Sequence, residues 1–122
     1  MGAERKKILV VDDEKNIREA ITYILKKAGY WVQSAPDGSE ALVLLEKFDF
    51  DLILTDLNMP YMDGLEIIQE IQRKKPKIKI VLITASGDSG IASGADEKQL
   101  LRCLNKPIRK KDVLELTRKI LG

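Results

Sequence analysis

Apolar residues recur along the chain in two patterns, short unbroken runs and longer stretches with three- and four-residue spacing. Unbroken runs are typical of strands that are buried on both faces of a parallel sheet. They predict strands at Ile8–Val11, Leu52–Thr55 and Ile78–Thr84, and the aromatic and β-branched run Tyr30–Ala35 predicts another. Four strands are therefore expected before residue 85.

The spaced stretches predict amphipathic helices between these strands. Apolar positions at helical spacing extend from Lys15 to Ala28, and Gly29 follows as a helix stop. A second helix is expected after the Asp-Gly turn at 37–38, and a third after a capping-box pattern at 63–66. The last amphipathic stretch covers residues 113–120. Strands and helices thus alternate along the chain.

The segment before the last helix gives a weaker pattern. Residues 86–95 are rich in Gly and Ser, which disfavour a helix, so a loop or a short, frayed fourth helix is expected there. Asp96–Arg102 is compatible with one or two helical turns. This leaves only Cys103–Asn105 for a fifth strand.

Alternating strands and helices predict an α/β fold, a doubly wound parallel sheet with helices on both faces. The 122 residues suit a single domain over 1–122. The apolar share of 44% and the charged share of 33% are typical of a globular protein in water, without a membrane-length apolar run. The short amino-terminal segment leaves no room for a signal peptide, so a cytoplasmic location without membrane association is expected.

The numbers of histidine, cysteine and charged residues limit the kinds of site that the chain can form. The chain has no histidine, which excludes Ser-His and Cys-His nucleophile pairs and histidine metal ligands. Its single cysteine cannot form an internal disulfide. The net charge is only +2, and the excess of basic residues after Lys98 is interpreted as a solvated helix face. Direct binding of nucleic acid is not expected.

Polar residues follow the predicted strands at their carboxyl ends. Asp12, Asp13 and Glu14 follow the first strand, and Asp56 follows the third. Carboxyl ends of parallel strands meet at one edge of the sheet, where ligands of open α/β folds bind. Clustered carboxylates repel one another and need a cation, and oxygen ligands alone favour Mg²⁺, with Mn²⁺ as a substitute. One carboxylate would then be placed to attack a phosphoryl group.

Four segments together resemble the response-regulator receiver family of two-component signalling. They are Val10–Glu14, Thr55–Gly64 (TDLNMPYMDG), Thr84-Ala85 and Lys106-Pro107, and the resemblance covers nearly the whole chain. It implies a flavodoxin-like, five-stranded parallel sheet in the order 2-1-3-4-5. It also implies a signalling protein that is not an enzyme beyond accepting a phosphoryl group and slowly losing it.

The resemblance assigns a metal role to four residues. Asp56 would be the phosphoryl acceptor and also a ligand of Mg²⁺. Asp13 would bind the ion directly, Asn58 through its backbone carbonyl, and Asp12 through a water molecule.

The resemblance also implies partners. Lys106 would contact the phosphoryl group, and Thr84 would be the switch hydroxyl. The donor would be a sensor histidine kinase or a histidine phosphotransfer protein, and the downstream target is unknown. Ile17, Ala20 and Ile21 would lie on the docking helix, although the pattern assigns most of them to the core.

Two features depart from the family pattern. Cys103 stands where the family has an aromatic residue that moves with the threonine. The Gly-Ala pair that precedes the fifth strand occurs earlier here, at residues 94–95, after the Gly-rich segment 86–95. Both changes affect the region that would switch on phosphorylation.

The residues also bear on several other classes of protein. Three acids after the first strand would repel the pyrophosphate of a dinucleotide. A phosphatase with an aspartate nucleophile needs a second Asp two residues later, where Asn58 follows Asp56. The remaining alternative is a receiver-like module that binds its partner without phosphorylation, and the presence of Asp13, Asp56, Thr84 and Lys106 favours phosphorylation instead.

Overall fold

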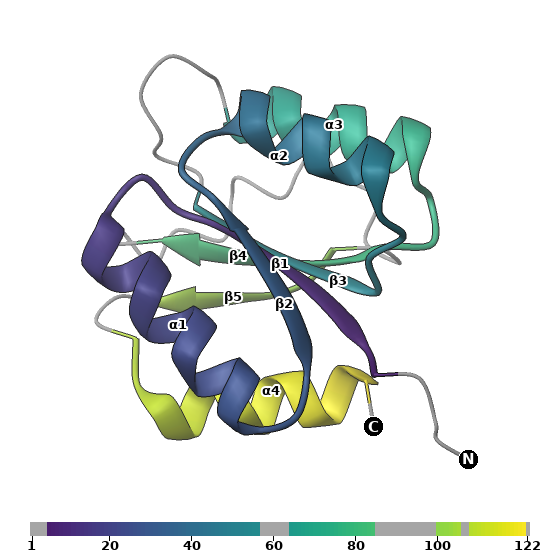
Figure 1. The fold of residues 1–122 in the computed structure, drawn as a ribbon. Coiled ribbons are helices and arrows are strands. Elements are labelled where there is room, and N and C mark those ends of the chain that lie inside the picture. The colour runs from purple at the N-terminus through teal and green to yellow at the C-terminus, as the bar shows by residue number, and fades with distance from the viewer. Residues whose placement is uncertain (1–4, 57–63, 85–99, 106–107, 122) are drawn as a thin grey trace.

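The structure, a computed structural model, describes residues 5–56, 64–84, 100–105 and 108–121. Five strands in these segments form one sheet in the order β2-β1-β3-β4-β5, with every neighbouring pair parallel (Figure 1). The strands are β1 (Lys7–Val11), β2 (Trp31–Ala35), β3 (Leu52–Asp56), β4 (Lys79–Thr84) and β5 (Leu100–Asn105). The predicted doubly wound sheet and its strand order are confirmed.

Helices cover both faces of this sheet. The described helices are α1 (Lys15–Lys27), α2 (Gly38–Lys47), α3 (Gly64–Lys74) and α4 (Lys110–Leu121). As Figure 1 shows, α1 and α4 lie on one face, and α2 and α3 lie on the other. Within the described segments, no helix is both long and apolar enough to span a membrane.

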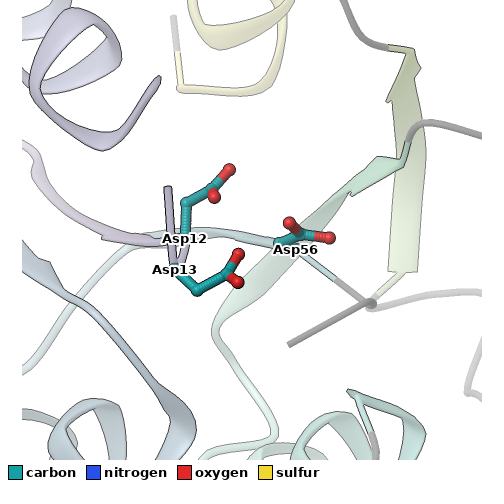
Figure 2. Close-up of side chains that lie close together, drawn as sticks. All are labelled: Asp12, Asp13 and Asp56. Atoms are coloured by element: carbon teal, nitrogen blue, oxygen red, sulfur yellow. The ribbon is translucent and has the colours of Figure 1, made fainter. Parts of the chain in front are cut away.

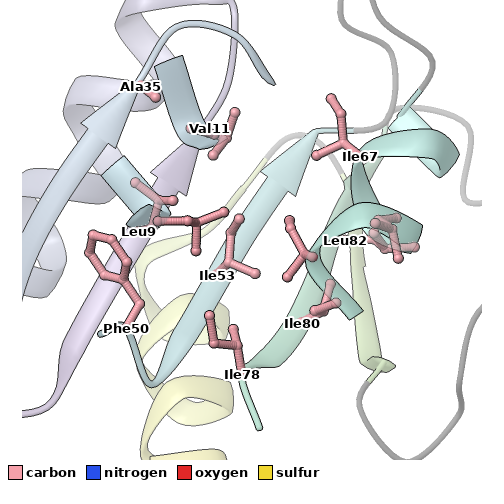
Figure 3. Close-up of a cluster of buried hydrophobic side chains, with 13 residues drawn as sticks. Leu9, Val11, Ala35, Phe50, Ile53, Ile67, Ile78, Ile80 and Leu82 are labelled. Carbon is pink, nitrogen blue, oxygen red and sulfur yellow. The ribbon is translucent and has the colours of Figure 1, made fainter. Parts of the chain in front are cut away.

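The core consists of two layers, one on each face of the sheet. In β1, Leu9 and Val11 belong to the layer under α2 and α3 (Figure 3), while Ile8 and Val10 belong to the layer under α1 and α4. All five residues of β3 are buried. Successive residues of a strand face opposite layers of the core, so every residue along a central strand must be apolar. This explains the unbroken apolar runs of the sequence.

Local signals in the sequence fix two of the helix ends. Gly29 follows α1 with a φ of 101°, a left-handed conformation that favours glycine. Asp37 caps α2, since its Oδ1 accepts a hydrogen bond from the backbone N–H of Glu40 at 2.9 Å. The capping box predicted before α3 begins at Asp63, which lies outside the described residues.

The prediction for the residues before the last helix was partly wrong. Leu100–Arg102, expected in a helical turn, belong to β5, which runs from Leu100 to Asn105. Their backbone pairs with β4, with Leu100 opposite Ile80 and Arg102 opposite Val81, so one extra residue forms a bulge between them. The reason is that pairing satisfies the backbone of β4, an advantage that local periodicity does not reveal. Residues 86–95, where a loop or a short, frayed helix was expected, lie outside the described part of the chain.

Candidate functional site

Three of the predicted site residues meet at the carboxyl edge of the sheet. Val11, the last residue of β1, pairs in register with Thr55 of β3, so the next residues, Asp12 and Asp56, come side by side. Asp13 follows in the loop toward α1. Figure 2 shows the three carboxylates projecting into the same small region.

The cluster is compact, and two of its three side chains are buried. A carboxylate oxygen from each of Asp12, Asp13 and Asp56 lies within 4.8 Å of one from each of the others. Asp12 is 0% exposed and Asp56 is 2% exposed, whereas Asp13 is exposed. Like charges this close repel strongly when water is excluded, because the effective dielectric constant is low. The site therefore attracts cations.

Backbone contacts hold the first acidic residue in place. The Oδ1 atom of Asp12 accepts a hydrogen bond from the N–H of Glu14 at 2.8 Å, which closes a tight turn after β1. The N–H of Asp12 donates to the carbonyl of Ala35 at 3.2 Å, and Arg18 Nη1 donates to the carbonyl of Asp12 at 2.9 Å. The turn is thus tied to both β2 and α1.

The contact made by Arg18 was not predicted from the sequence. This side chain reaches back from the first turns of α1 and orients the peptide that joins Asp12 to Asp13. The available signal was a basic residue six positions after Asp12, one turn inside the helix. That spacing alone also fits an ordinary exposed helix residue, so it does not identify the contact.

The donor set fits a small divalent cation. Oxygen atoms that bind Mg²⁺ directly lie about 2.0–2.1 Å from it, so two such ligands are at most about 4.2 Å apart. The three carboxylates offer oxygens that all lie within 4.8 Å of one another, close to this limit, so the cluster could hold such an ion. One oxygen of Asp12 already accepts the hydrogen bond from the N–H of Glu14.

The remaining predicted residues are only partly described. Thr84 is the last residue of β4, and its backbone pairs with Asn105 at the same edge of the sheet. Lys106 comes next in the chain, but it lies outside the described residues, as does Asn58. Cys103 is described only through its backbone, which pairs with Leu82.

The three docking candidates on α1 differ in burial. Ile21 is 1% exposed and belongs to the core, and Ile17 is partly buried against the same cluster. Ala20 is exposed, so the expectation that most of the three are core residues holds for the two isoleucines. Ala20 and Ile17 are the two that remain accessible to a partner.

The fold and the site together define a class of protein. The chain winds from β1 to β2 in one direction and from β1 to β3 in the other, and the acids lie at the point where the direction changes. This is a doubly wound α/β protein with an acidic, cation-attracting site. A sequence model described as the response regulator receiver domain matches residues 8–118. The chain belongs to the response regulator receiver family.

A curated relative supports this assignment. The chain is 36% identical over 111 residues to the response regulator receiver protein Anae109_2439 of Anaeromyxobacter sp. (strain Fw109-5). The match covers 91% of this chain and 47% of the relative. The chain spans 38–48% of the length of five curated relatives that it matches, this one included.

Solved structures share the fold over almost the whole chain. The response regulator TrrA of Thermotoga maritima, in complex with Mg²⁺-BeF, has a TM-score of 0.81 and is 37% identical, with 95% of this chain and 99% of that one covered. The complex of the histidine kinase ThkA with TrrA gives a TM-score of 0.80 at 36% identity, with coverages of 96% and 99%.

Proposed function

We propose that this receiver domain accepts a phosphoryl group on Asp56 from a phosphohistidine on a partner kinase or phosphotransfer protein. The observation that carries the proposal is the convergence of Asp12, Asp13 and Asp56 within 4.8 Å at the carboxyl edge of the sheet. The neighbour TrrA, which binds Mg²⁺-BeF and pairs with a histidine kinase, supports both the chemistry and the donor.

The cation would be held by the residues assigned from the family pattern. Asp13, Asp56 and the backbone carbonyl of Asn58 would be direct ligands of Mg²⁺, and Asp12 would be linked through water. Mn²⁺, which prefers similar oxygen ligands, would substitute. When bound, the ion would neutralise the carboxylates and part of the negative charge that develops on the phosphoryl oxygens.

The transfer itself requires one nucleophile. A carboxylate oxygen of Asp56 attacks the phosphorus atom, a new O–P bond forms, and the P–N bond to the donor imidazole breaks, with its electron pair leaving on the nitrogen. Because Asp56 is buried at the end of β3, competing water has little access to its carboxylate. The product is an acyl phosphate on Asp56.

Two further residues would respond to the new charge. The ammonium group of Lys106 would stabilise the phosphoryl oxygens, and the hydroxyl of Thr84 would donate a hydrogen bond to one of them. Because phosphorylation adds about −1.5 to −2 charge units, these contacts bias the surrounding surface toward a second state. A downstream partner would recognise that state.

The direct test uses small phosphoryl donors. Incubation with Mg²⁺ and phosphoramidate, whose P–N bond resembles that of phosphohistidine, should add one phosphoryl group, measured by intact-protein mass. Asp56→Asn should abolish the addition, and removal of Mg²⁺ with EDTA should prevent it. Asp112→Asn, which changes a half-exposed acid of α4 outside the acidic cluster, serves as the matched control and should react like the wild type.

The same experiment distinguishes the proposed function from the alternative, partner binding without phosphorylation. A module that binds partners without phosphorylation would show no added mass with either phosphoramidate or acetyl phosphate. Equal labelling of the wild type and Asp56→Asn would place the acceptor elsewhere and contradict the proposal. The clustering of three carboxylates favours the phosphorylated function, since a docking surface has no need of it.

A further inference from the structure

A pocket of about 310 Å³ opens at the opposite end of the sheet from the acidic cluster. It lies where α3 leads into β4 and where the chain enters β3. Its apolar wall is formed by Phe50, Pro76 and Ile78. Phe50 and Ile78 are 5% and 3% exposed and lie at the same end of the core cluster in Figure 3, so these two side chains of the wall belong to the core.

Three lysines, Lys74, Lys75 and Lys77, surround this apolar wall, and Asp49 is the one acid in the lining. Lys74 is engaged with one glutamate of α3 at 3.3 Å and one of α2 at 3.9 Å. Lys75 pairs with Asp49 at 3.4 Å, and that acid's side chain is 95% exposed. Lys77 is exposed and forms no ion pair with any described residue.

The surroundings of the pocket are also basic. In a parallel α/β fold the helices run opposite to the strands, so all helix carboxyl ends lie at the amino edge of the sheet. The last turn of every described helix carries basic residues there: Lys26, Lys27, Lys47, Arg73, Lys74, Arg118 and Lys119. Such residues complement the helix dipole. Lys77 lies outside any helix, so that explanation does not apply to it.

We propose that this pocket binds a small amphipathic organic anion, an apolar ring or short chain that carries a carboxylate, sulfonate or phosphate group. The volume is at the lower limit for small-molecule sites, which argues for a small ligand. The apolar part would pack against Phe50, Pro76 and Ile78, and the anionic group would contact Lys77. The ion pairs of the other two lysines are surface pairs, which an arriving anion displaces easily.

The test uses 8-anilinonaphthalene-1-sulfonate as the probe and the folded protein in buffer. Fluorescence titration should saturate at one probe per chain, and changes in backbone amide shifts should be confined to residues 49–50 and 74–78. The uncharged analogue N-phenyl-1-naphthylamine should bind at least about fivefold more weakly, since it lacks the anionic group. Equal binding of the two compounds would contradict the role of the lysines.

Three variants make the test specific. Lys77→Glu should raise the Kd about tenfold, whereas Asp49→Asn, which removes the acid at the mouth, should lower it about two- to threefold. Lys119→Glu makes the same charge change at the same end of the sheet but on the other face, and should leave the Kd within about twofold.

Equal weakening by Lys77→Glu and Lys119→Glu would mean that the probe responds only to the general charge of this end, and would overturn the proposal. Probe binding without saturation, or amide changes spread over other segments, would overturn it as well. Urea unfolding of Lys77→Glu and Asp49→Asn with a wild-type midpoint guards against loss of folding as an explanation, because partly unfolded chains bind this probe through exposed apolar surface.

Discussion

Glu70 of α3 is held between two cations on the surface of the molecule. Lys74 lies 3.3 Å from its carboxylate, and Arg73 also donates to it. The hydrogen bond from Lys74, with a smaller contribution from Arg73, lowers the pKa of Glu70 below its ordinary value of 4.5, against the opposing effect of burial. The ionised form is therefore favoured in the folded state.

This shift predicts a pH-dependent effect of Glu70→Gln. A carboxyl whose folded pKa is depressed contributes stability above its unfolded pKa, and that contribution is lost as pH falls through the folded pKa. The variant should be slightly less stable than the wild type at pH 7 and equal to it below the lowered pKa, because an exposed pair contributes little. Urea unfolding at both pH values measures the difference. A difference that grows toward low pH would contradict the assignment.

Among individual residues, the sequence correctly predicted the positions of those that lie at the ends of strands. Asp12 and Asp13 come just after β1, and Asp56 is the last residue of β3, so the fold class alone brings them to one edge. The Arg18 contact depends on the direction of one long side chain across a turn, which no spacing rule specifies. The roles of Lys106 and Asn58 remain predictions, since both lie outside the described residues.

Among the elements, α2 offers a clean test of a local signal. Asp37 accepts a hydrogen bond from the Glu40 N–H and satisfies one of the free donors of the first turn. Asp37→Ala should lower the free energy of unfolding by about 1 kcal/mol, whereas Asp37→Asn, which keeps the acceptor, should change it far less. Chemical denaturation measures both, and equal losses would show that the cap is not the cause.

The success of the prediction varied with how each element is stabilised. Strands β1, β3 and β4 are covered on both faces, so their apolar runs are unambiguous. The edge strand β5 contains Arg102 and Asn105 and is interrupted by a bulge, so its sequence lacks such a run. Its structure comes from pairing with β4, a contact between distant residues that local patterns do not contain.

Across the whole molecule, the only tryptophan lies at the end remote from the acids. Trp31 begins β2 and packs against Phe48, with ring centroids 5.0 Å apart, while Ala35 at the other end of the strand contacts Asp12. Four residues of strand separate the two ends by about 13 Å. The environment of the indole is thus independent of the acidic cluster.

We therefore expect tryptophan emission to be unchanged, within a few per cent, when Mg²⁺ is added or when Asp56 is phosphorylated. Intact-protein mass on the same sample would verify that phosphorylation has taken place, and unfolding in urea would show that the indole responds to its surroundings. A clear quenching by Mg²⁺ alone would indicate that the two ends of the sheet are coupled.

The basic helix ends at one edge and the clustered acids at the other give the molecule a pronounced electric dipole along its strands. A dipolar protein rotates in the field of an approaching macromolecule before the two surfaces touch. A cationic macromolecule would approach the edge with the carboxylates, and an anionic one would approach the edge with the lysines. Orientation at a distance is thus set by the direction in which the helices run, and it should weaken as ionic strength rises.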